Sequence, residues 1–129
     1  MKKHTIARLS MVTAMALLLA MLLGTTRALA VYDQTPPTTP ANLTDAGMSF
    51  EDGETWLFWQ QSTDNLDAQS IIRYDIYVNG AFDHSRVGVG RTILYGNPGV
   101  FNTYQVIAVD SAGNQSAPAS LTTCAGAVC

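Results

Sequence analysis

The stretch that most constrains the fold is residues 104–114, where strand-forming residues run directly into a turn signal. Tyr104, Val106 and Ala108 fall on one side of a period-2 alternation, and the residues between them are also strand formers, as in a strand covered on both faces. Asp110 then begins Asp-Ser-Ala-Gly-Asn, whose Asp side chain can turn the backbone and whose Gly and Asn tolerate positive φ. The stretch therefore predicts a buried strand that ends in a hairpin or tight loop.

Other short segments share this alternation or this content of β-branched and aromatic residues. Asn79-Gly80 separates two of them and is a strong hairpin signal. No helical periodicity occurs after residue 30. These patterns predict an all-β fold, a seven-stranded antiparallel two-sheet sandwich. Its strands are expected over residues 41–44, 55–59, 71–78, 81–86, 91–94, 104–109 and 115–121.

The phase of the alternation separates a core from a second aromatic surface. Trp59 shares its phase with Leu57, and we expect it to pack between the sheets. The predicted structural core is Leu57, Trp59, Tyr74, Ile76, Tyr104, Val106 and Ala108. Trp56, Phe58 and Tyr77 have the opposite phase and form a candidate contact surface. For Trp56 and Phe58 the alternative is that the loop of residues 45–54 or the proline-rich leader covers them as a satellite cluster.

Residues 1–30 are typical of a secretory signal peptide. Lys2, Lys3 and Arg8 precede an apolar run over residues 9–23, and the segment ends in Ala28-Leu29-Ala30. The apolar run is shorter than the roughly 20 residues of a spanning helix, so cleavage after Ala30 is favoured over a retained membrane anchor. We expect a secreted protein, extracellular or periplasmic, with no membrane span after cleavage. Residues 31–40 form a Pro/Thr-rich leader.

The charge balance of the remaining chain excludes two kinds of partner. Removing the signal peptide leaves 99 residues, enough for one domain. They carry three arginines and no lysine against ten acidic residues, a net charge of −7. A chain of this charge lacks the basic patch that nucleic acids and anionic membranes require.

The cysteines lie in a tail over residues 122–129. The exported compartment permits a bridge between Cys124 and Cys129, which would close a short ring and contribute at most about 2 kcal/mol. An intermolecular bridge or two free thiols are the alternatives, and the spacing is weak support for a metal site.

Several segments together resemble a fibronectin type III domain of the kind found beside catalytic domains in secreted bacterial polysaccharide-degrading enzymes. The resemblance covers residues 36–121. It implies that Tyr104 is a tyrosine corner, whose hydroxyl bonds to the backbone of residues 97–101. An immunoglobulin domain is the nearest competitor, but Val106 stands where its second core cysteine would be. The resembling segments are Pro-Pro-x-x-Pro-x-Asn-Leu, Leu57-x-Trp59, Ser62-Thr-Asp-Asn65, Tyr74-Asp-Ile-Tyr-Val-Asn-Gly80 and residues 104–114.

The residues that could carry chemistry are few. His84 is the single histidine after the signal peptide, and we expect a solvated histidine on an edge strand. Asp64, Asp67 and Asp110 are oxygen ligands of the type that Ca²⁺ binds, but their turn contexts favour capping of turns. The glycosylation acceptor patterns at Asn42 and Asn114 are expected to be coincidental. The sequence predicts no enzyme activity, no cofactor and no metal.

Two functions are compatible with these observations. The first is a non-catalytic module for binding or spacing at the cell surface or outside the cell, acting on a polysaccharide, the cell wall or a partner protein. The second is a structural or adhesion protein that makes protein contacts. An exposed line of aromatic rings would favour sugar stacking, whereas a smooth apolar sheet face would favour protein contact.

Overall fold

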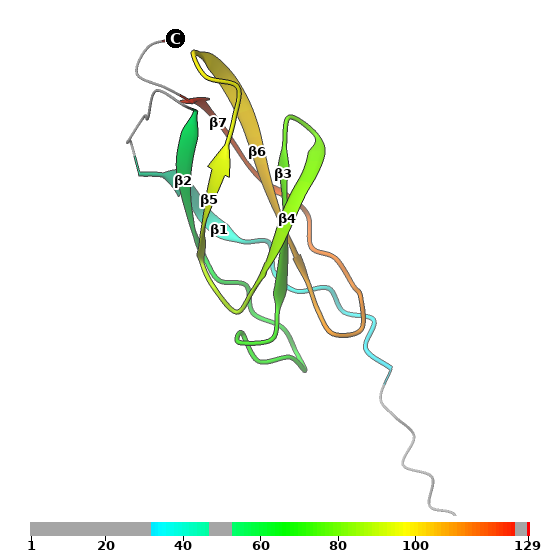
Figure 1. Ribbon diagram of the computed structural model, residues 1–129. Helices are drawn as coiled ribbons and strands as arrows, with labels where there is room; N and C mark the ends of the chain where they lie inside the picture. The colour runs from blue at the N-terminus through cyan, green and yellow to red at the C-terminus, as the bar shows by residue number, and fades with distance from the viewer. Residues whose placement is uncertain (1–31, 47–52, 126–128) are drawn as a thin grey trace, which may run out of the picture. The chain divides into compact units, whose positions relative to one another are not determined.

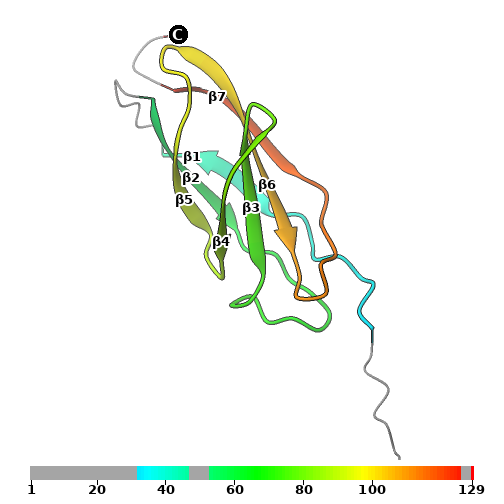
Figure 2. The same ribbon diagram turned by 45° about the vertical axis from the view of Figure 1, so that its right-hand side comes forward.

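The computed structural model describes residues 32–46, 53–125 and 129. In this part of the chain, seven strands form two β-sheets (Figures 1 and 2). One sheet has the order β1-β2-β5 and the other has the order β4-β3-β6-β7. Neighbouring strands are antiparallel throughout, which confirms the predicted antiparallel sandwich. The strands are β1 (Ala41–Asp45), β2 (Glu54–Gln60), β3 (Arg73–Val78), β4 (Ala81–Val87), β5 (Arg91–Tyr95), β6 (Val100–Val109) and β7 (Ala119–Ala125).

The core lies between the sheets and is built from alternate residues of the central strands. Trp59 is 6% exposed and contacts Tyr74, with the two ring centroids 5.3 Å apart. Tyr74 and Ile76 lie opposite Ala108 and Val106 across β3 and β6, so these four side chains share the inner face. Each residue assigned to the core from the sequence is buried, and Ile72 and Leu94 join them.

The hairpin between β3 and β4 is the one that the sequence predicts. Val78 pairs with Ala81, so the loop has two residues. Asn79 has φ 50° and Gly80 has φ 82°, the positive values that a type I′ turn requires.

The bounds of the last two strands differ from expectation. β6 begins at Val100, four residues before the expected start at Tyr104, because Val100 pairs with Ala125 of β7. β7 covers Ala119–Ala125 instead of residues 115–121. Pro118 has no N–H to donate, and the segment before it forms one isolated bridge, between Val109 and Gln115. The β-domain therefore extends past the expected boundary at residue 121.

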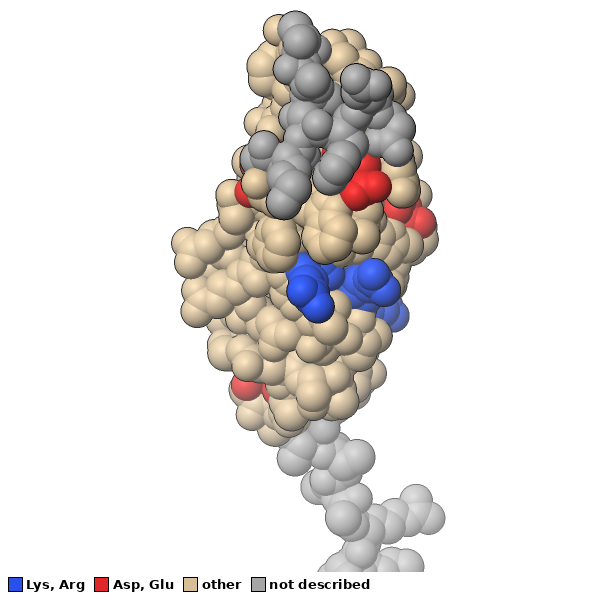
Figure 3. Space-filling view, turned by 60° about the vertical axis from the view of Figure 1, so that its left-hand side comes forward, with Lys and Arg blue, Asp and Glu red and all other residues tan. Residues whose placement is uncertain are grey.

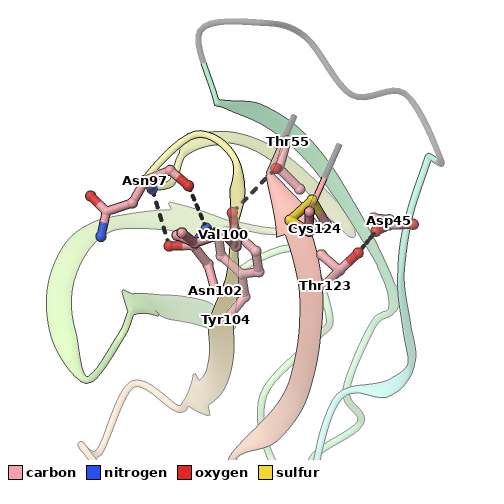
Figure 4. Close-up of a disulfide and its surroundings, with 9 residues drawn as sticks. Asp45, Thr55, Asn97, Val100, Asn102, Tyr104, Thr123 and Cys124 are labelled. Atoms are coloured by element: carbon pink, nitrogen blue, oxygen red, sulfur yellow. Dashed lines mark hydrogen bonds between the residues drawn. A yellow bond between two sulfur atoms is a disulfide. The ribbon is translucent and has the colours of Figure 1, made fainter. Parts of the chain in front are cut away.

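The predicted tyrosine corner is wrong. The Tyr104 hydroxyl forms its hydrogen bond with Thr55 Oγ1, at 3.2 Å, and not with the backbone of residues 97–101 (Figure 4). Asn102 ties that loop instead. Its amide nitrogen donates to the carbonyls of Asn97 and Val100, at 2.9 and 3.0 Å, and its carbonyl oxygen accepts the Asn97 N–H at 3.0 Å.

Close packing at Gly96 explains why an asparagine can reach this loop. A Cβ at Gly96 would collide with the Tyr104 hydroxyl and with the Asn102 amide. The glycine therefore lets the β5–β6 loop lie directly against both side chains.

The ends of the domain differ in how much the structure describes. Cys124 and Cys129 form a disulfide, one of the pairings that the sequence permits. The signal peptide expected over residues 1–30 lies outside the described residues. In the part of the chain that the structure describes, no helix is long and apolar enough to span a membrane.

Candidate binding surface

The outward-facing residues of β2 and β5 form a mixed aromatic and cationic surface. Trp56 lies opposite Ile93 and Phe58 lies opposite Arg91, and side chains paired in this way are neighbours on one face of the sheet. Trp56 and Phe58 are partly exposed, whereas Ile93 and Tyr95 are exposed. We call this surface the β2–β5 face; its members are Trp56, Phe58, Arg91, Ile93 and Tyr95.

The carboxylate of Glu54 fixes the two polar aromatic rings of the β2–β5 face. Trp56 Nε1 donates to Glu54 Oε1 at 2.6 Å, and the Tyr95 hydroxyl donates to Glu54 Oε2 at 3.3 Å. Both rings are thus oriented before any ligand binds. Residues 47–52 of the loop that could cover Trp56 and Phe58 lie outside the described residues.

Tyr77, the third residue of the predicted contact surface, lies on the other sheet. It packs against Phe82 of β4 with ring centroids 5.6 Å apart and an interplanar angle of 73°. The structure therefore brings Trp56 and Phe58 together and separates Tyr77 from them. The sequence pattern gives the phase of each strand but not which sheet the strand joins.

His84 lies on the edge strand β4. Contrary to the expectation of a solvated histidine, both of its ring nitrogens have side-chain partners. Its Nδ1 bonds to Asp83 Oδ2 at 2.5 Å and its Nε2 bonds to Thr92 Oγ1 at 2.6 Å. An ionised carboxylate only accepts, so the proton between the ring and Asp83 belongs to Nδ1. Thr92 is 3% exposed, so its hydroxyl is not open to a substrate and serves to join β5 to β4.

Two of the three aspartates considered as calcium ligands lie near each other, and Asp33 takes the place of the third, Asp67. Asp64 and Asp110 each bring a carboxylate oxygen within 4.8 Å of the other and of Asp33, which no sequence motif marks. Asp67 instead accepts the N–H and hydroxyl of Ser111, at 2.5 and 2.9 Å.

These carboxylates hold turns. Asp64 accepts the backbone N–H groups of Leu66 and Asp67, both at 2.9 Å, and these bonds lower the pKa of the Asp64 carboxyl below its ordinary value of 3.8. Asp110 accepts the backbone N–H and the side-chain amide of Asn114, both at 2.7 Å. This is the turn capping that the sequence predicts.

Comparison with solved structures identifies the architecture. A chitinase, ChiA74 from Bacillus thuringiensis, is 27% identical with a TM-score of 0.62; the match covers 73% of this chain and 14% of the chitinase. The spore cortex lytic enzyme SleM of Clostridium perfringens is 15% identical with a TM-score of 0.56, over 68% of this chain and 28% of the enzyme. The fibronectin type III domain of human fibronectin type III domain containing protein 3 is 17% identical with a TM-score of 0.52, over 71% of this chain and 90% of that domain. No protein-family model and no curated protein matches the sequence.

The two packed antiparallel sheets, with three and four strands, place the chain in the class of immunoglobulin-like β-sandwiches. Within that class it has the fibronectin type III fold, which is the resemblance that the sequence motifs indicated. The chain spans only a small part of the two bacterial enzymes that it matches.

Proposed function

We propose that the chain is a secreted, non-catalytic binding or spacer module that contacts polysaccharide through the β2–β5 face. The observation that carries this proposal is the placement of Trp56 and Phe58 on the outer face of the three-stranded sheet, next to the exposed Ile93 and Tyr95. Aromatic faces stack on sugar rings, and contiguous exposed apolar surface is typical of binding sites. Support also comes from the chitinase match, because a module of this fold forms part of that polysaccharide-degrading enzyme.

The test is binding to chitin, cellulose and peptidoglycan, measured by co-sedimentation and by tryptophan fluorescence. We expect at least one polymer to bind, and Trp56→Ala to weaken that binding by about tenfold or more. Tyr77→Ala is the matched control, because it removes an aromatic ring from the other sheet. Equal loss in both variants, or binding unaffected by Trp56→Ala, would count against the β2–β5 face.

The second candidate is a structural or adhesion role through protein contacts. It is favoured by Tyr77 together with Phe82, which is 57% exposed, on the four-stranded sheet. Cross-linking of the protein to cell-surface proteins that is lost in Phe82→Ala and retained in Trp56→Ala would support it over polysaccharide binding.

A further inference from the structure

A groove opens beside the β2–β5 face and is lined from both sheets. β2 and β5 belong to one sheet, β4 belongs to the other, and the turn between β4 and β5 contributes Val89. The groove has a volume of about 420 Å³, within the range of small-molecule sites. Its lining residues are Trp56, Arg86, Val89, Arg91, Thr92 and Ile93.

The two arginines of the groove have no acidic partner in the described part of the chain. Arg73 lies on β3, next to the strand of Arg86 in the same sheet, and forms an ion pair with Asp75 at 2.9 Å. Arg86 and Arg91 form no ion pair with any described residue. Figure 3 shows arginine side chains gathered in the middle of one face, with acidic side chains above and below them. A local cationic site therefore exists in a chain whose net charge is negative.

The hydroxyl of the buried Thr92 holds Arg86 in the groove. Its Nε donates to Thr92 Oγ1 at 3.3 Å, and the same hydroxyl bonds to His84 Nε2 at 2.6 Å. This bond uses the Nε–H and leaves the terminal amino groups of the guanidinium for a ligand. Such preorganisation lowers the entropy that binding would otherwise cost.

The geometry points to a carboxylated sugar unit as the ligand of this groove. This inference rests on the proposed polysaccharide-binding function of the β2–β5 face and names the class of polymer. The sugar ring packs on Trp56, and its carboxylate lies between Arg86 and Arg91, because a guanidinium binds a carboxylate through two parallel N–H donors. A neutral sugar would leave both guanidinium groups without a counter-charge. The negative charge elsewhere on the chain repels an acidic polymer, so that polymer would be held only at the groove.

The test compares polygalacturonate fragments with the same fragments after methyl esterification, which removes the charge and keeps the ring. Isothermal titration should show binding of the acidic fragments and at least about tenfold weaker binding of the ester. Arg86→Gln and Arg91→Gln should each weaken binding of the acidic fragments about tenfold, and added salt should weaken it further. Arg73→Gln is the matched control and should bind as the parent protein does. Thermal melts of each variant separate lost binding from lost folding.

Each other outcome overturns a specific statement. Equal affinity for acid and ester, with dependence on Trp56, overturns the acidic sugar and leaves the proposed function in place. Binding of neutral polymers alone also overturns the acidic sugar and leaves the proposed function in place. Poly-glutamate that binds as tightly, with the same dependence on Arg86 and Arg91, replaces the sugar with an acidic peptide. Absence of binding to any polymer overturns both the inference and the proposed function.

Discussion

The two ends of β6 are closed by different chemistry. At the end where β6 begins, the closing bonds are made by neutral side-chain amides. Asn102 binds the loop at Asn97 (Figure 4), and its carbonyl oxygen also accepts from Asn79 Nδ2 at 2.8 Å. We call this the amide end. At the opposite end Asp110 follows the strand, near Asp33 and Asp64; we call this the acid end. The difference teaches that one fold can close its two ends with different chemistry, and that the bonds of Asn102 to Asn97 and Asn79 involve no titratable group.

The largest effect is expected at the amide end, in Asn102→Leu. Asn102 is fully buried, and its removal leaves backbone groups of the loop and the Asn79 side-chain nitrogen without the partner that Asn102 supplies. We expect a loss of about 3 kcal/mol in the free energy of unfolding. Urea melts measure it, and Gln105→Ala, three residues further and on the other face of β6, should cost less than about 0.5 kcal/mol. If the two variants lost similar stability, the stabilising role given to Asn102 at the amide end would be contradicted.

Asp110→Ala tests the acid end. The substitution removes two 2.7 Å bonds to Asn114, although it also relieves repulsion from Asp33 and Asp64. We expect a net loss of about 2 kcal/mol at neutral pH. Hydrogen exchange should show faster opening of the turn after β6 and unchanged protection of Asn79 and Asn97. Faster exchange at both ends would mean that the ends are coupled.

Tyr104→Phe asks whether the tyrosine matters at the amide end. Its hydroxyl has one side-chain partner, Thr55 Oγ1, so removal of the oxygen should cost about 1 kcal/mol. The melting midpoint measures the cost. A loss as large as that of Asn102→Leu would restore the tyrosine corner that the family resemblance implied.

Asp64→Asn has the smallest expected effect and sharpens the contrast in pH response. Because the folded pKa of Asp64 is lowered below 3.8, its ionised form contributes stability above that pH, and this contribution is lost as the pH falls through the folded pKa. The stability difference between the parent protein and Asp64→Asn should therefore shrink in acid. The carboxyl is exposed, so the effect is small. The loss of stability in Asn102→Leu should be the same at neutral and at acidic pH. If this loss also became smaller in acid, the contrast between the two ends would be contradicted.

Local alternation predicted the strands and the burial of their side chains. The two tryptophans of β2 show this, since their opposite phases put Trp59 in the core and Trp56 on the outer face. The start of β6 was missed because Val100, Phe101 and Asn102 gain their strand conformation from pairing with β7, which is distant in sequence.

The candidate site was only half visible in the sequence. Trp56 and Phe58 follow from the pattern of one strand. The meeting of Arg86 and Arg91 with Trp56 depends on how β4 of one sheet lies beside β5 of the other. Asp33 was likewise missed, because it reaches the acid end through the leader, whose composition carries no strand pattern. Side chains that approach across sheets leave no periodic signal in a single sequence.

The leader and the last strand leave the domain at opposite ends of the strands. Asn114 at the acid end holds the Asp33 carbonyl at 3.1 Å, whereas Ala125 closes β7 beside Val100 at the amide end (Figure 1). A pulling force applied between Tyr32 and Ala125 would therefore act along β1 and β7. Their hydrogen bonds to β2 and β6 run perpendicular to the strands, so several bonds in each pair would have to break together in shear. Pulled in this way, the sandwich would therefore load its first and last strands in shear.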